Sequence, residues 1–138
     1  KATHYHPKDI GGLIISVDSM NKKNWYDKNS YWQWAGDDWQ SKTNNQCSIS
    51  SISMSCKNPS KLANKWGSFL DLSVNESGDR HVIKGDDFKI FFTHDDVKGI
   101  DYLSKLTLKI NNSEHNDKIF QQYKENEIEI CGTKIDLI

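Results

Sequence analysis

Residues 24–45 carry the side chains best suited to hold a ligand, because indole rings alternate there with acidic and turn-forming residues. Indole faces stack on flat ligand surfaces, and carboxylates accept hydrogen bonds from ligand hydroxyl groups. This combination is typical of a carbohydrate-binding platform. It is also typical of a long connection whose rings pack on the core as a lid, and we favour that second interpretation. The candidate binding residues are Trp25, Trp32, Trp34, Trp39, Asp37 and Asp38.

Signatures of catalysis are missing from the sequence. It contains no G-x-S-x-G nucleophile motif, no glycine-rich phosphate motif and no H-E-x-x-H metal motif. The five histidines are scattered through polar segments, and the paired aspartates at 37–38, 86–87 and 95–96 are typical of turns. We therefore expect no catalytic residue, no metal ligand and no cofactor, and a protein that is not an enzyme.

A calcium loop is the one metal site that the pattern suggests. Oxygen-bearing side chains occupy alternate positions from Asp71 to Asp79. Such a loop needs glycine at its sixth position and a bidentate glutamate at its twelfth, where this sequence has Glu76 and Val82. The solvated face of a strand gives the same alternation, and we favour that interpretation.

Two of the three cysteines, Cys47 and Cys56, enclose a segment in which Ser alternates with Ile and Met. A short hairpin there would bring the two sulfurs together, and we predict a disulfide between them. The alternative is two unrelated thiols, as in a cytosolic protein. Cys131 lies in a strand-like pattern and is expected to be a small buried residue.

The length of 138 residues predicts one domain, 1–138. The net charge is −1 and the charges are interspersed, so we expect no direct nucleic-acid partner. No apolar run is long enough for a membrane span. Because the chain opens at Lys1 rather than Met, either a leader has been removed or the chain has been shortened. We expect contact with a membrane only through a helix upstream of Lys1.

The front of the chain predicts a helix over 7–22, followed by the Trp-rich loop 24–45. Pro7 suits the first helical position, and apolar residues follow at helical spacing. Gly11 and Gly12 oppose the helix, and a strand over 13–17 is the alternative. Residues 57–66 are expected to be a connector with at most one helical turn.

Strand patterns dominate from about residue 68 to 138. Two apolar runs, 69–74 and 88–92, flank a polar segment rich in turn formers. Residues 103–110 alternate as a half-buried strand, and the C-terminal alternation slips at Gly132, which indicates a two-residue turn or a bulge. The predicted class is α+β, with the N-terminal helix packed on an antiparallel sheet of four to five strands.

Residues 69–92 resemble the globular domains of type IV pilins and type II secretion pseudopilins. Many of these carry a strand, a turn, a polar loop with a further glycine, and then Asp before a Phe-rich strand. The corresponding residues here are Val74, Asn75, Gly78, Gly85, Asp87, Phe88 and Phe91. The resemblance implies a structural subunit that packs its helix into a filament and presents its sheet and loops outward.

The functional expectation is therefore a non-enzymatic extracytoplasmic subunit that acts in filament assembly, secretion or DNA uptake. Its partners would be other protein subunits, and its location the periplasm or the cell surface. The alternatives are a small secreted carbohydrate-binding module, with a glycan as ligand, and a periplasmic immunity or inhibitor protein. The candidate subunit-contact loop consists of Asn75, Asp79, Asp86 and Asp87.

Overall fold

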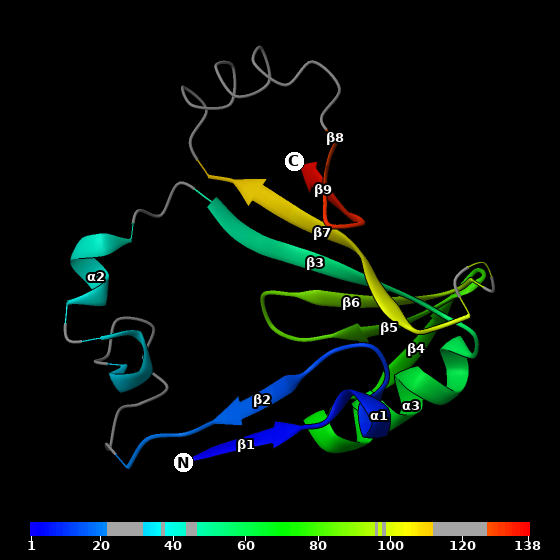
Figure 1. The fold of residues 1–138 in the computed structure, drawn as a ribbon, viewed down its shortest axis with the longest axis horizontal. Coiled ribbons are helices and arrows are strands. Elements are labelled where there is room, and N and C mark those ends of the chain that lie inside the picture. Colours follow the sequence, from blue (N-terminus) through cyan, green and yellow to red (C-terminus); the bar gives the residue numbers. More distant parts are fainter. Residues whose placement is uncertain (22–31, 37, 44–46, 96, 98, 112–126) are drawn as a thin grey trace.

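The centre of the fold is a seven-stranded mixed sheet with the strand order β4-β5-β6-β3-β7-β9-β8, seen in a computed structural model (Figure 1). The structure describes residues 1–21, 32–36, 38–43, 47–95, 97, 99–111 and 127–138. The strands of this sheet are β3 (Cys47–Cys56), β4 (Val74–Ser77), β5 (Arg80–Lys84), β6 (Lys89–His94), β7 (Tyr102–Ile110), β8 (Glu127–Ile130) and β9 (Thr133–Leu137). A second, two-stranded sheet and the short helices lie outside it: β1 (Ala2–Tyr5), β2 (Ile15–Asp18), α1 (Pro7–Ile10), α2 (Trp39–Lys42) and the 3-10 helix η1 (Gln33–Ala35).

The sheet repeats one arrangement on either side of its central pair. β3 runs parallel to β6, and β5 runs antiparallel to β6. In the same way β7 runs parallel to β9, and β8 runs antiparallel to β9. The central pair, β3 and β7, is antiparallel and joins the two halves. The N-terminal half carries β4 as an additional edge strand.

Helix α3 (Pro59–Leu70) covers one face of the N-terminal half of the sheet. Its start is defined by Asn58, whose side-chain oxygen accepts a hydrogen bond from the Lys61 amide at 3.0 Å, and by Pro59 in the first turn. It ends at Asp71, which adopts a left-handed conformation with φ 56°. The buried face of the helix consists of Leu62, Ala63, Trp66 and Gly67.

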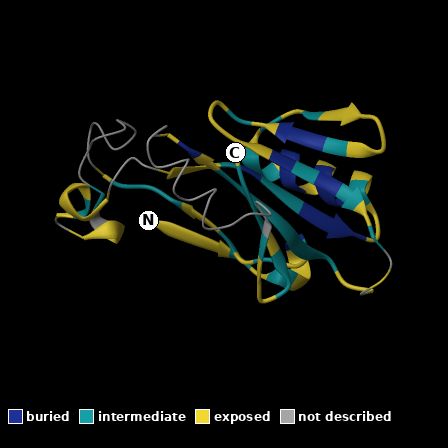
Figure 2. Ribbon diagram, turned by 90° about the horizontal axis from the view of Figure 1, so that it is seen from above, coloured by how far each residue is buried: buried dark blue, intermediate teal, exposed yellow. Residues whose placement is uncertain are grey.

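The core lies between α3 and β3, β5 and β6, where the buried positions gather (Figure 2). Trp66 meets Phe92 edge to face, with ring centroids 5.4 Å apart, and both side chains are almost fully buried. Burial of each such side chain stabilises the fold by about 1.5–3 kcal/mol or more. The other members of this cluster are Met54, Cys56, Leu62, Ala63, Ile83 and Ile90.

Residues 1–18 form a strap that packs against α3. The strap consists of the β1–β2 hairpin, with α1 in its connection. Ile10 is only 2% exposed, and its carbonyl accepts a hydrogen bond from Trp66 Nε1 at 2.6 Å. Tyr5 stacks on Phe69 with ring centroids 5.0 Å apart. These contacts connect the chain start to the helix that organises the core.

The predicted helix over 7–22 is wrong, because α1 ends at Ile10. Gly11 and Gly12 adopt φ +78° and +70°, values that residues with a side chain rarely take. A Cβ on Gly12 would lie 2.3 Å from the Asp101 carbonyl oxygen. The glycines are therefore needed for a close backbone approach, and strand β2 follows them. This strand overlaps the alternative predicted for 13–17.

The predicted fold class is also wrong. Most of the regular structure is β, the large sheet is mixed rather than antiparallel, and it begins at Cys47 rather than near residue 68. The connector expected over 57–66 is the first part of α3, because Pro59 occupies a position where a helix tolerates it. The apolar run 69–74, predicted as a strand, is the end of α3 and the start of β4.

The predicted Cys47–Cys56 disulfide does not form. Both residues belong to the single extended strand β3, one at each end, and both thiols are free. Nine residue steps at about 3.3 Å place them roughly 30 Å apart, whereas a disulfide needs α-carbons within about 7 Å. The argument for an oxidising compartment therefore fails, and the expected location stays a prediction. Cys131 is exposed, and forms with Gly132 the two-residue turn between β8 and β9.

Within the part of the chain that the structure describes, no helix has the length and apolar character needed to cross a membrane.

Candidate functional site

A cavity lies where the start of β3 and the end of β7 meet α2 and the turn between β5 and β6. We call it the β3–β7 pocket, and its volume is about 860 Å³. This is within the usual range for small-molecule sites, roughly 300–1,000 Å³. Its lining is formed by Trp39, Gln40, Thr43, Cys47, Ser48, Ile49, Ser50, Asp87, Lys109 and Asn111.

Three polar groups in this pocket lack a partner among the described residues. Asp87 and Lys109 carry opposite charges, yet neither forms an ion pair within the described ranges. The indole Nε1 of Trp39 is buried from solvent and has no hydrogen-bond acceptor among the described residues. An unpaired buried donor costs about 1–3 kcal/mol, so an acceptor at this place is favoured.

Elements far apart in the sequence position these groups. Antiparallel pairing of Ser48 with Lys109 brings the start of β3 beside the end of β7. A register shift between Ile49 and Ser51 marks a bulge there, which is a common feature next to binding sites. Ile49 is 58% exposed and supplies an apolar surface to the same pocket.

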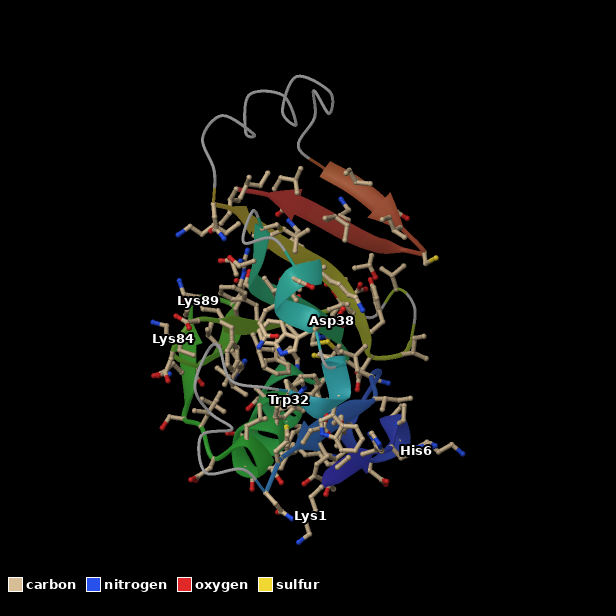
Figure 3. All side chains as sticks on the ribbon, turned by 90° about the vertical axis from the view of Figure 1, so that its left-hand side faces the viewer. Lys1, His6, Trp32, Asp38, Lys84 and Lys89 are labelled. Atoms are coloured by element: carbon tan, nitrogen blue, oxygen red, sulfur yellow. The ribbon has the colours of Figure 1, made fainter. Side chains whose placement is uncertain are left out.

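The structure brings together two of the residues singled out from the sequence, Trp39 and Asp87. The others are dispersed. Trp32 is half-buried, Trp34 is 57% exposed, and Asp38 pairs with Lys42 at 2.7 Å (Figure 3). Trp25 and Asp37 lie outside the described residues. Among the described indole rings of this segment only Trp39 lines the pocket, so the rings that the structure describes do not combine into a carbohydrate platform.

The candidate subunit-contact loop is divided among separate elements. Asn75 lies in β4, Asp79 in the β4–β5 turn beside Arg80, and Asp86 and Asp87 in the β5–β6 turn. The calcium pattern is divided in the same way, since Asp71 ends α3. Within the described ranges no three His, Cys, Asp or Glu side chains lie close enough to hold a metal ion.

A second cavity, which we call the lysine pocket, lies between the strap and the start of α3. Its volume is about 450 Å³. It is lined by Lys8, Asp9, Ile10, Gly11, Lys57, Asn58, Lys61, Leu62, Lys65 and Asp101. Sequence reasoning missed this pocket because Lys8 is distant in the chain. The four-residue spacing of Lys57, Lys61 and Lys65 was the available signal.

The altered pKa values of Cys56 and Tyr102 both have structural explanations. Burial, with a smaller effect from the Asp101 charge, raises the pKa of the Cys56 thiol to about 11. Cys56 is therefore a weak nucleophile. The Tyr102 hydroxyl donates a 2.6 Å hydrogen bond to Asp95, and this bond is the main cause that raises the pKa of Tyr102. Asp95 also accepts a hydrogen bond from the Val97 amide, so this group holds the β6–β7 connection.

Comparison with solved structures finds this arrangement of elements elsewhere. A hypothetical protein from Staphylococcus aureus superimposes with a TM-score of 0.53 at 16% identity, over 72% of this chain and 36% of that protein. A methylmalonyl-CoA epimerase from Mycobacterium tuberculosis superimposes with a TM-score of 0.43 at 7% identity, over 64% of this chain and 85% of the epimerase. A hypothetical protein from Bacillus halodurans superimposes with a TM-score of 0.44 at 8% identity, over 67% of this chain and 94% of that protein. No family model and no curated protein matches the sequence.

These similarities concern the fold alone, and this chain spans little more than a third of the length of the Staphylococcus aureus protein. The resemblance to pilins is wrong, because the large sheet is mixed and is not the antiparallel sheet expected of such a domain. The N-terminal helix expected over 7–22 is also absent from the described residues, where the strap takes its place. The filament-subunit function is therefore wrong, and neither the carbohydrate module nor the immunity protein is supported.

Proposed function

We propose that this chain is a non-enzymatic binding domain, and that the β3–β7 pocket holds a small zwitterionic molecule, a free α-amino acid. The observation that carries the proposal is the presence of one carboxylate, Asp87, and one ammonium group, Lys109, on the same cavity without an ion pair between them. A ligand that carries both an ammonium and a carboxylate group would pair with each. Charge-assisted hydrogen bonds of this kind are about twice as strong as neutral ones.

Two further groups support an amino acid over a simple salt. The Trp39 indole N–H offers one additional donor to a ligand oxygen, and it has no acceptor among the described residues. Ile49 offers an apolar surface to a ligand side chain. The absence of reaction is part of the proposal, and it is supported by the described lining, which includes no histidine and only one carboxylate.

Isothermal titration calorimetry with L-leucine and two analogues tests this function. 4-Methylpentanoate lacks the ammonium group, and 3-methylbutylamine lacks the carboxylate. We expect L-leucine to bind and each analogue to bind about 10- to 100-fold more weakly, because each loses one charged hydrogen bond. Asp87→Asn and Lys109→Gln should weaken L-leucine binding to a similar degree.

The control variants are Asp79→Asn and Lys84→Gln, which change exposed charges outside the pocket. They should bind L-leucine as the unmodified chain does. If none of the twenty L-amino acids binds, or if the pocket and control variants bind equally, the proposed function is wrong. Nuclear magnetic resonance of the ligand after prolonged incubation should show no conversion.

A further inference from the structure

The lysine pocket is separate from the β3–β7 pocket and presents a different chemistry. Three segments contribute its four lysines: α1, the β3–α3 connection and α3 itself. The lining includes only two carboxylates, Asp9 and Asp101, on a chain whose net charge is −1. A local excess of positive charge on a weakly acidic chain needs an explanation other than overall composition.

The four lysines are not neutralised by the described part of the protein. None of Lys8, Lys57, Lys61 and Lys65 forms an ion pair with a described carboxylate. Asp101 is engaged differently, since its Oδ1 accepts a hydrogen bond from the Lys57 backbone amide at 3.2 Å. Lys61 and Lys65 are one helical turn apart, a spacing at which like charges destabilise a helix.

The backbone of α3 contributes less than these ammonium groups. One of its free N–H groups, that of Lys61, is already bonded to the Asn58 side chain. The positive charge of the pocket therefore comes mainly from lysine side chains. A small anion with several charged oxygens fits them best, since each phosphate group can accept hydrogen bonds from more than one ammonium group.

The pocket lies at the seam between the strap and α3. Figure 1 shows α1 beside α3 at this place. Lys8 comes from the strap side of this seam, and the other three lysines come from the opposite side. Repulsion between these positive charges would oppose the packing of Ile10 and its hydrogen bond to Trp66. An anion between them would replace this repulsion by attraction on both sides.

We propose that the lysine pocket binds a small molecule that carries a diphosphate group, and that the bound ligand holds the strap against α3. Four lysines supply enough positive charge for two phosphate groups, and a volume of about 450 Å³ is within the usual range for small-molecule sites. The diphosphate belongs to inorganic pyrophosphate or to a phosphorylated metabolite such as a nucleoside diphosphate. The experiment distinguishes these two sources.

Calorimetry with the complete chain at low ionic strength tests the site. Inorganic pyrophosphate, ADP and orthophosphate are titrated separately, and we expect orthophosphate to bind at least about tenfold more weakly than pyrophosphate. Tighter binding of ADP than of pyrophosphate would assign the metabolite as the source, and the reverse would assign the inorganic ion. The double variant Lys61→Gln/Lys65→Gln should bind pyrophosphate about 10- to 100-fold more weakly.

The matched control is Lys84→Gln/Lys89→Gln, which removes two lysines that face each other on β5 and β6. Figure 3 shows them on the opposite side of the molecule from His6, the residue that caps α1. This control should bind pyrophosphate normally. Absence of pyrophosphate and ADP binding overturns the proposed site, as does equal weakening in both double variants.

Hydrogen exchange tests the effect on the strap. The amides of Asp9 and Ile10 bond to the His6 carbonyl and that of Gly11 to the Pro7 carbonyl, and pyrophosphate should slow their exchange. Lys8→Gln should retain most of the affinity while much of this protection is lost. Unchanged exchange in a chain saturated with ligand would refute the clamping of the strap. Asp87→Asn should alter neither result, which keeps this inference separate from the proposed function.

Discussion

Substitution of Gly12 by alanine should destabilise the protein far more than an ordinary glycine substitution. Gly12 has φ +70°, and a Cβ there would lie 2.3 Å from the Asp101 carbonyl oxygen, 2.6 Å from its carbon and 3.0 Å from the Tyr102 nitrogen. All three are backbone atoms, so no side-chain rotation can relieve the clash. The strap must therefore move away from Asp101.

The expected loss in the free energy of unfolding follows from the contacts that the strap loses when it moves. The left-handed backbone itself costs about 1–2 kcal/mol for an alanine. Exposure of Ile10 costs about 1.5–3 kcal/mol, and loss of an acceptor for the buried Trp66 N–H costs about 1–3 kcal/mol. Partial relaxation reduces this total, and we expect a loss of at least about 3 kcal/mol in the free energy of unfolding.

Gly78 provides the matched control. It has φ +64° in the β4–β5 turn, but no atom lies within 4 Å of a Cβ built on it. Gly78→Ala should therefore cost only the backbone term, about 1–2 kcal/mol. Equilibrium unfolding in urea, followed by tryptophan fluorescence, measures both variants. Equal losses in the two variants would refute the argument that close contact with Asp101 fixes the strap.

Three further predictions concern the core, a thiol and an ion pair. Phe92→Ala removes a fully buried ring that meets Trp66, and should lower the free energy of unfolding by about 3–5 kcal/mol in a urea titration. In the native protein Cys56 should react with a thiol reagent far more slowly than the exposed Cys47 and Cys131, and rapid reaction of all three thiols would contradict its burial. Because folding raises the pKa of Cys56 from 9.0 to about 11, its contribution to stability is complete below pH 9 and should be lost as the pH rises toward 11. Asp136→Asn breaks the 2.7 Å pair with Lys105, which is about one third exposed, and should cost no more than about 1 kcal/mol, with a smaller effect at high salt.

Local patterns predicted some elements well. The alternation over 103–110 corresponds to β7, and the phase slip at Gly132 corresponds to the turn between β8 and β9. Both signals arise within a few residues, where side-chain periodicity and turn chemistry decide the conformation. The C-terminal hairpin could therefore be identified before any partner strand was known.

The failures came from partners distant in the chain. Alternating Ser, Ile and Met suit a hairpin and a single long strand alike, and only pairing with β6 and β7 makes 47–56 one continuous strand. Gly11 and Gly12 weakened the predicted helix, but their role depends on Asp101, about ninety residues later. Trp39 and Asp87 were found as candidates because of their residue types. Their common pocket with Lys109 depends on the pairing of β3 with β7. In the same way, Lys8 meets the lysines of α3 only because the strap packs against that helix.

The central position of β3 has a consequence for how the chain folds. Ser51 of β3 pairs with Lys89 of β6, 38 residues later in the chain, and Cys47 pairs with Ile110 of β7, 63 residues later. In contrast, the pairs β4–β5, β5–β6 and β8–β9 are local hairpins. Local hairpins close with a small loss of chain entropy, and long loops close later. We expect the hairpins to form first and the pairing of β3 to be the slow step. Substitutions in β3 should then reduce the folding rate, whereas those in the β8–β9 hairpin should mainly accelerate unfolding.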